Sequence, residues 1–147
     1  MCFMLFAGTD RELTQGEWRK DAPDVWVRAV LGDEARIKTH FQKPVVQYVG
    51  STAGCGCDFP HWILFNGKVP ADGFDGRDDD QKASDHDNAR RLERLLRESG
   101  ERDIELYSVW AGNWSRSPIA VEEIKLEDII APTFLFGEQV FYRVKVS

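Results

Sequence analysis

The sequence has few of the residues that would place it in a specialised class of protein. Its 147 residues include only three cysteines and three histidines. An odd number of cysteines, two of them separated by a single glycine, makes a poor disulfide framework. Reduced thiols in a cytosolic compartment fit this pattern better. We therefore expect a cytoplasmic protein whose cysteines are free.

Long hydrophobic runs are also missing. No stretch approaches the roughly 20 apolar residues that a membrane-spanning helix needs. The N-terminal segment 1–7 is apolar but short, it lacks a basic region, and Asp10, Arg11 and Glu12 follow it directly. This pattern argues against a signal peptide. We expect no association with a membrane.

Basic residues are in the minority. Lysine and arginine number 19 against 25 aspartates and glutamates, which gives a net charge of −6. Broad contact with a nucleic-acid backbone requires a basic surface that can release counterions. We therefore expect no nucleic-acid partner, and we look for a small-molecule ligand or a protein partner instead.

The remaining composition is that of an ordinary globular domain. Apolar residues make up 42% of the chain and aromatic residues 12%, which is enough for a hydrophobic core. A chain of this length folds without disulfide or metal staples, because it buries roughly 70% of its unfolded surface. We expect one domain over residues 1–147.

The hydrophobic pattern predicts an α+β fold. Strand-forming segments rich in β-branched and aromatic residues occur at 2–7, 25–30, 45–49, 104–110 and 139–146. One segment has a helical pattern, with Ala89, Leu92, Leu95 and Leu96 on one stripe and Gly100 as its stop signal. Since strands and helices do not alternate, we expect a mostly antiparallel or mixed sheet with one principal helix at about 85–99.

Seven aspartates crowd the segment 70–87, which has few apolar residues. This composition predicts an exposed loop. A calcium-binding loop would need oxygen ligands at alternate positions and a glycine in the middle. The aspartate spacing does not meet that requirement, so we interpret the segment as a solvated loop.

The most unusual segment is the glycine- and cysteine-rich stretch 50–62. A strand-like run, 45–49, precedes it, and a second apolar run, 62–65, follows. Cys55 and Cys57 are separated by one residue, so in extended backbone their thiols point to the same side. His61 follows four residues later. Together they are candidate ligands for zinc, with Cys2 or His40 as a possible fourth.

Other interpretations of this stretch remain open. Cys55 and Cys57 could form a thiol-redox pair, although the neighbouring Asp58 would disfavour a thiolate. A nucleophilic Cys55 or Cys57, with His61 or His40 as its base and a carboxylate such as Asp58, is a further alternative. Equally, the stretch could be a glycine turn that joins two core strands, with the cysteines buried and inert, and Cys2 could be a buried strand cysteine. A phosphate-binding loop is excluded, because the stretch has no lysine and does not lead into a helix.

Several segments together resemble an uncharacterised family of small bacterial proteins. The similarity lies in the N-terminal strand and in the glycine-cysteine loop, and it extends over most of the chain through segments 1–6, 9–10, 40–44, 48–51, 54–59 and 134–146. The resemblance implies a bacterial origin. It implies no activity and no site residues, because no activity is established for that family.

Two hypotheses for function follow. The first is a binding or accessory domain with a ligand or partner site near the glycine-cysteine loop, where Trp62, Trp110 and Trp114 would be candidate lining residues. The second is a metal-binding or thiol-redox protein that uses Cys55 and Cys57. The sequence does not decide whether the protein is an enzyme.

Overall fold

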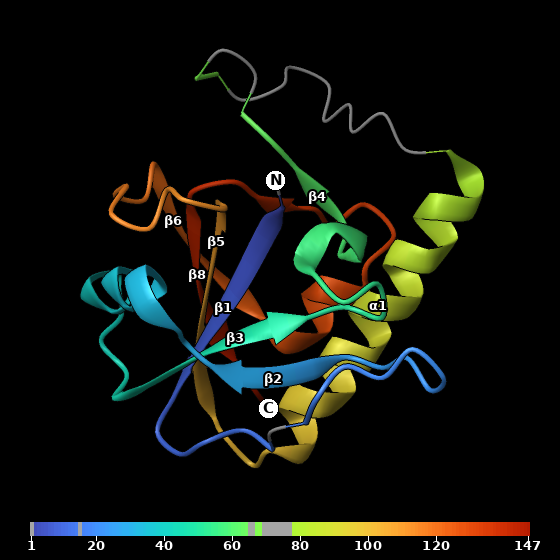
Figure 1. Ribbon diagram of the computed structural model, residues 1–147, viewed down its shortest axis with the longest axis horizontal. Coiled ribbons are helices and arrows are strands. Elements are labelled where there is room, and N and C mark those ends of the chain that lie inside the picture. The colour runs from blue at the N-terminus through green and yellow to red at the C-terminus, as the bar shows by residue number, and fades with distance from the viewer. Residues whose placement is uncertain (1, 15, 65–66, 69–77) are drawn as a thin grey trace.

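The computed structural model describes residues 2–14, 16–64, 67–68 and 78–147. Its central element is a six-stranded sheet with the strand order β2-β3-β1-β5-β8-β6 (Figure 1). All neighbouring strands are antiparallel except β6 and β8, which are parallel. The strands are β1 (Phe3–Thr9), β2 (Trp26–Ala29), β3 (Val45–Gly50), β5 (Asp103–Trp110), β6 (Ala120–Lys125) and β8 (Val140–Lys145).

Shorter elements complete the fold. A small parallel pair, β4 (His61–Trp62) and β7 (Phe136–Gly137), lies beyond one end of the main sheet. Three 3₁₀ segments are η1 (Gly32–His40), η2 (Gly56–Asp58) and η3 (Leu126–Ile130). With one α-helix and a mixed, mostly antiparallel sheet in the described residues, the expected α+β class is confirmed.

The helix α1 (Asp79–Glu98) begins six residues earlier than the sequence pattern predicted. Asp78 caps it, because its side chain accepts a hydrogen bond from the backbone N–H of Gln81, and the Gln81 side chain accepts one from the N–H of Asp78. Aspartates in the first turn also favour the positive end of the helix dipole. The prediction of a loop through residue 87 was therefore wrong for 79–87, while its part at 70–77 lies outside the described residues.

The central strands of the sheet are buried on both faces. Phe3 and Leu5 of β1 point into a core formed with α1 and η3. Met4 and Phe6 point into a second core on the opposite face, where Ile37 of η1 covers them. Because consecutive strand residues face opposite ways, this alternation places the even-numbered Cys2 beside the second core.

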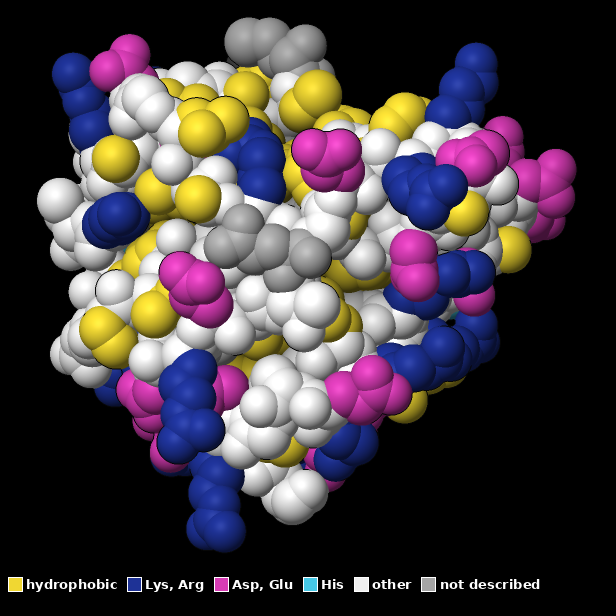
Figure 2. Space-filling model, turned by 60° about the horizontal axis from the view of Figure 1, so that its bottom comes forward, with side chains coloured by type: hydrophobic (Ala, Val, Ile, Leu, Met, Phe, Trp, Pro, Cys, Tyr) yellow, Lys and Arg dark blue, Asp and Glu magenta, His cyan; other side chains and the backbone are white. Residues whose placement is uncertain are grey.

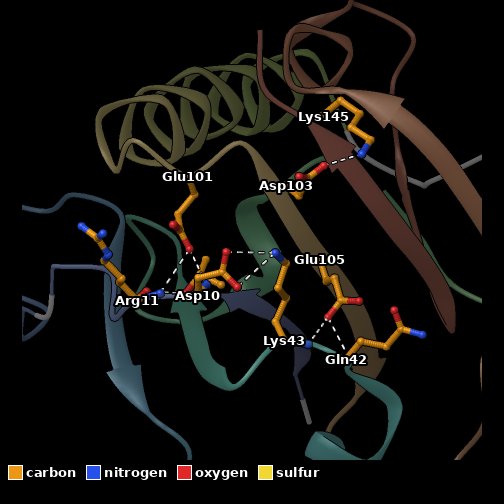
Figure 3. Close-up of polar contacts among 9 residues, drawn as sticks. Asp10, Arg11, Gln42, Lys43, Glu101, Asp103, Glu105 and Lys145 are labelled. Atoms are coloured by element: carbon orange, nitrogen blue, oxygen red, sulfur yellow. Dashed lines mark hydrogen bonds and ion pairs between the residues drawn. The ribbon is translucent and has the colours of Figure 1, made fainter.

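Polar contacts close the end of the sheet that lies farthest from Cys2 (Figure 3). The buried Glu105 carboxylate accepts hydrogen bonds from the backbone N–H groups of Gln42 and Lys43, at 3.0 and 2.9 Å. The Lys43 ammonium group pairs with Asp10. These contacts hold the loop before β3 in place. They therefore fix the position of the start of β3, the strand that leads into the glycine-cysteine loop.

The surface carries both signs of charge. Figure 2 shows lysine and arginine side chains interspersed with aspartate and glutamate side chains over the face in view, with hydrophobic side chains between them. Among the described residues, no helix combines the length and the apolar character that crossing a membrane requires.

A candidate three-thiol site

Three cysteine thiols meet where the chain begins β1. The sulfur atoms of Cys2, Cys55 and Cys57 all lie within 4.8 Å of one another. Cys2 directly precedes β1, and the other two flank Gly56 at the start of η2. All three side chains are half-buried and none forms a disulfide. The C-x-C pair predicted from spacing is thus brought together with a cysteine more than fifty positions away in the sequence.

Topology explains this meeting. Strand β3 runs antiparallel to β1, with Leu5 opposite Val49 and Phe6 opposite Tyr48. The C-terminal end of β3 therefore lies beside the N-terminal end of β1. The loop that follows β3 turns back over this edge, between the start of β1 and helix α1 (Figure 1).

Gly56 allows the loop to pack directly on β1. A Cβ atom at this position would collide with the backbone carbonyl oxygen of Phe3 and would lie 3.3 Å from the Cα of Met4. Only glycine lets two backbones approach this closely. Since Gly56 stands between Cys55 and Cys57 and contacts the residue after Cys2, this approach is what places the three sulfurs together.

Backbone and side-chain hydrogen bonds hold the turn before the cysteines. The N–H of Ser51 donates to the carbonyl of Cys55 at 2.7 Å, the Ser51 hydroxyl donates to the same carbonyl, and the N–H of Gly54 donates to Ser51 at 2.9 Å. Gly54 has a positive φ of 88°, a conformation that glycine adopts without strain. The turn is closed on itself, so Cys55 leaves it in a fixed direction.

Helix α1 clamps the same turn from the side. The buried Asn88 side chain accepts a hydrogen bond from the N–H of Thr52 at 2.8 Å and donates one to the Thr52 hydroxyl at 3.0 Å. Ser84, one turn earlier, donates to Asp58 at 3.4 Å. The loop is therefore tied to the helix on both sides of the two cysteines.

Burial dominates the electrostatics of the cluster. It raises the pKa of the Cys55 thiol to about 12, and the neighbouring sulfurs of Cys57 and Cys2 act in the same direction, while a backbone hydrogen bond from Cys57 opposes them. The pKa of the nearby Tyr48 is also raised, by burial first and by the cysteines next. Without a metal ion, Cys55 is therefore a protonated and weakly nucleophilic thiol at neutral pH.

The two histidines proposed as ligands are not members of the three-thiol group. His61 has its Nδ1 atom 2.7 Å from the carbonyl oxygen of Phe59, and its ring stacks on Phe3 with centroids 4.2 Å apart. The Nε2 atom of His40 lies 2.9 Å from the carbonyl oxygen of Trp114. Of the candidate fourth ligands, the structure brings Cys2 to the pair, whereas the His40 ring packs against Tyr107 with centroids 5.2 Å apart.

The tryptophans that were candidate lining residues are partly buried and pack against the two cores. Trp62 and Trp110 contact the core under α1, and Trp114 contacts the opposite one. Trp18, which the sequence did not single out, lies against the loop: its indole N–H donates to the carbonyl of Thr52 at 2.9 Å, and its ring lies 3.4 Å from a Cβ position at Gly54. No sequence pattern identified it, because the contact joins two irregular segments.

Comparisons of the chain with family models, with curated proteins and with solved structures found no match. The site is therefore interpreted from its own geometry and chemistry.

Proposed function

We propose that this protein binds a soft metal ion through Cys2, Cys55 and Cys57, with zinc as the first candidate. The observation that carries the proposal is the mutual approach of three sulfurs within 4.8 Å. Thiolates are the protein ligands that soft and borderline metal ions prefer. A bound metal ion would also agree with the broader hypothesis, in which a binding domain holds a ligand near the glycine-cysteine loop.

The sulfur separations are close to those of a loaded site. With zinc–sulfur bonds of about 2.3 Å, two sulfurs on one tetrahedral zinc ion lie about 3.8 Å apart, and they can never be more than about 4.6 Å apart. The observed limit of 4.8 Å requires only a small contraction. Three protein ligands on zinc leave a fourth position for water or another exogenous group, as in sites that act on a bound molecule.

A thiol-redox function is the second candidate, and the closeness of Cys2 to the pair favours it. A disulfide between Cys2 and either loop cysteine would link two segments that already touch. The high pKa of Cys55 weighs against it, because thiol exchange requires the thiolate. A metal ion meets no such obstacle, since it displaces the proton from a coordinating thiol. Either function requires a reducing compartment such as the cytoplasm.

Metal content and free thiols test the proposal together. Full-length protein purified under reducing conditions without chelator, or reloaded with zinc, should carry one zinc ion per chain and protect three thiols from a native thiol reagent. The variants Cys2→Ser, Cys55→Ser and Cys57→Ser should each lose the ion. Ala53→Ser, at an exposed position of the same loop, is the matched control and should keep it. Three reactive thiols and no retained zinc in folded wild-type protein would contradict zinc as the ion.

A further inference from the structure

The number of ligands at the three-thiol site restricts the ion that it can saturate. Among the described residues the group contains three sulfurs and no fourth ligand. His61 is engaged with Phe59 and Phe3, and His40 with Trp114. A zinc ion would need an exogenous group as its fourth ligand. An ion that prefers three-coordinate geometry would have all of its ligands supplied by the protein.

Charge further restricts which ion the three-thiol site can bind. Three thiolates carry three negative charges, so a monovalent ion leaves the complex at −2 and a divalent ion leaves it at −1. The sulfurs are half-buried beside apolar side chains: Cys2 packs on the core of Met4 and Phe6, and Cys57 on the core of Phe3. Placing a net charge in such surroundings is costly unless it is paired. Only a trivalent centre gives a neutral complex.

A cation beside Tyr48, which also senses the charge of the cysteines, is already paired. The Arg28 guanidinium lies 4.3 Å above the Tyr48 ring, and it donates two hydrogen bonds, of 2.7 and 2.9 Å, to the Glu34 carboxylate. Since Glu34 neutralises Arg28, this arginine supplies little net charge to offset an anionic complex.

We propose that the three-thiol site takes a trivalent, three-coordinate soft centre, represented by arsenite. This inference rests on the metal-binding function proposed above and names the ligand class. Each hydroxyl group of As(OH)₃ leaves as water with the proton of one thiol, so three arsenic–sulfur bonds form and three waters are released. Arsenic stays trivalent and sulfur is not oxidised, so the step needs no oxidant or reductant.

The site has the access and rigidity that this reaction requires. All three cysteine residues are partly exposed, so the site lies near the surface from which dissolved arsenite arrives. The contact of Gly56 with Phe3 and the hydrogen bonds of Asn88 to Thr52 hold Cys55 and Cys57 in place before the ligand arrives. A preorganised pair, with Cys2 alongside, avoids the ordering cost that a flexible set of thiols would pay on binding.

The test uses sodium arsenite and the full-length reduced protein, with zinc chloride in parallel. Intact-mass measurement should show one arsenic gained and three hydrogens lost. Arsenic-edge X-ray absorption should show three sulfur neighbours and no oxygen. Cys2→Ser should lose one sulfur neighbour or lose binding, and Ala53→Ser should behave as wild type. Arsenite should displace zinc, and an equal concentration of zinc should not displace arsenite.

Each alternative outcome is decisive. Wild-type arsenic bound by two sulfurs and an oxygen, or no arsenite bound, overturns the inference. If zinc is still held by the three thiols in that case, the metal-binding function stands. If neither ligand binds the folded protein, both proposals fail. Circular dichroism checks the fold of each variant, and if Cys2→Ser is unfolded, the sulfur count in the wild-type protein decides alone.

Discussion

Single residues determine whether the thiols meet, and substitution of Gly56 is the sharpest test of this. Its backbone lies against the carbonyl of Phe3, where a Cβ atom has no room. Phe3 is paired with Trp110 of β5, so it does not withdraw from Gly56 without breaking ladder hydrogen bonds.

Gly56→Ala should therefore destabilise the fold by about 1–3 kcal/mol, the usual cost of overpacking, and should move Cys55 and Cys57 away from Cys2. Urea unfolding measures the first effect, and the loss of metal affinity in the folded fraction measures the second. Gly16→Ala is the control, since a Cβ at Gly16 meets nothing within 4 Å. Equal stability and equal metal affinity for Gly56→Ala and wild type would show that Gly56 does not hold the cluster.

Residue identity alone predicted only part of the site. The spacing of Cys55 and Cys57 was sufficient to nominate the pair, because neighbours two apart share a side in extended backbone. Cys2 could be named only as one possible ligand among several, because its position depends on β1 pairing with β3. The short distance in sequence favoured His61, but its ring turns to Phe3 and its Nδ1 atom to Phe59.

At the scale of elements, helix α1 positions the loop through one buried amide. Asn88 bonds to both the N–H and the hydroxyl of Thr52, and its side chain also donates to the carbonyl of Ser84 at 3.0 Å. The contact connects the helix to the turn that precedes Cys55.

Asn88→Ala should cost about 1–3 kcal/mol, because it leaves the N–H of Thr52 without its acceptor. It should also speed hydrogen exchange of the loop amides and weaken metal binding. Arg90→Ala, on the exposed side of the same helix, should change neither quantity appreciably. Loop exchange as slow as in wild type would contradict the clamp.

The start of α1 illustrates why element boundaries were hard to predict. The aspartates around 78–80 look like loop residues by composition, yet they occupy the cap and first turn, where carboxylates are favourable. Ser84 is a residue type that also favours helix caps, but it lies inside the helix. The apolar stripe faces the core as predicted: Ala89, Leu92 and Leu96 are fully buried, and Leu95 is half-buried and packs against the same core.

At the scale of the whole molecule, an ion pair links the sheet edge to η1. Burial alone would raise the pKa of the Glu34 carboxyl, but hydrogen bonds from Arg28 and from the N–H of Leu31 outweigh it, and the net effect lowers this pKa. The same pairing raises the pKa of Arg28. A carboxyl group with a lowered pKa stabilises the fold when ionised, and that contribution is lost as the pH falls below its ordinary value of 4.5.

Glu34→Gln should therefore lower the free energy of unfolding by about 1 kcal/mol at pH 7, a figure reduced for partial exposure to solvent. The difference from wild type should shrink as the pH falls below 4.5 and Glu34 becomes protonated. Denaturant unfolding across this range measures it. Asp33→Asn, at the exposed neighbouring position, should change the free energy of unfolding at pH 7 much less than Glu34→Gln does. A difference that stays constant with pH would contradict the assignment.

The sequence predicted the class of fold well and the assembly poorly. Local hydrophobic patterns were enough to predict the strands at 45–49 and 104–110, because most side chains of each strand are buried. The run 62–65 was expected to be a core strand, but only His61–Trp62 pairs, with β7 in a separate small sheet, and residue 65 lies outside the described part of the chain. Strand order depends on long-range pairing, which no local pattern encodes, and the three-thiol cluster is a product of that order.

We propose that Cys2 completes the site begun by Cys55 and Cys57, and counting the sulfur neighbours of a bound ion decides whether it does. X-ray absorption at the metal edge, on the zinc-loaded or arsenite-loaded protein, should give three sulfur neighbours in the wild type and in Ala53→Ser. In Cys2→Ser it should give two, or no bound ion. Two sulfurs in the wild type, or unchanged binding in Cys2→Ser, would contradict it.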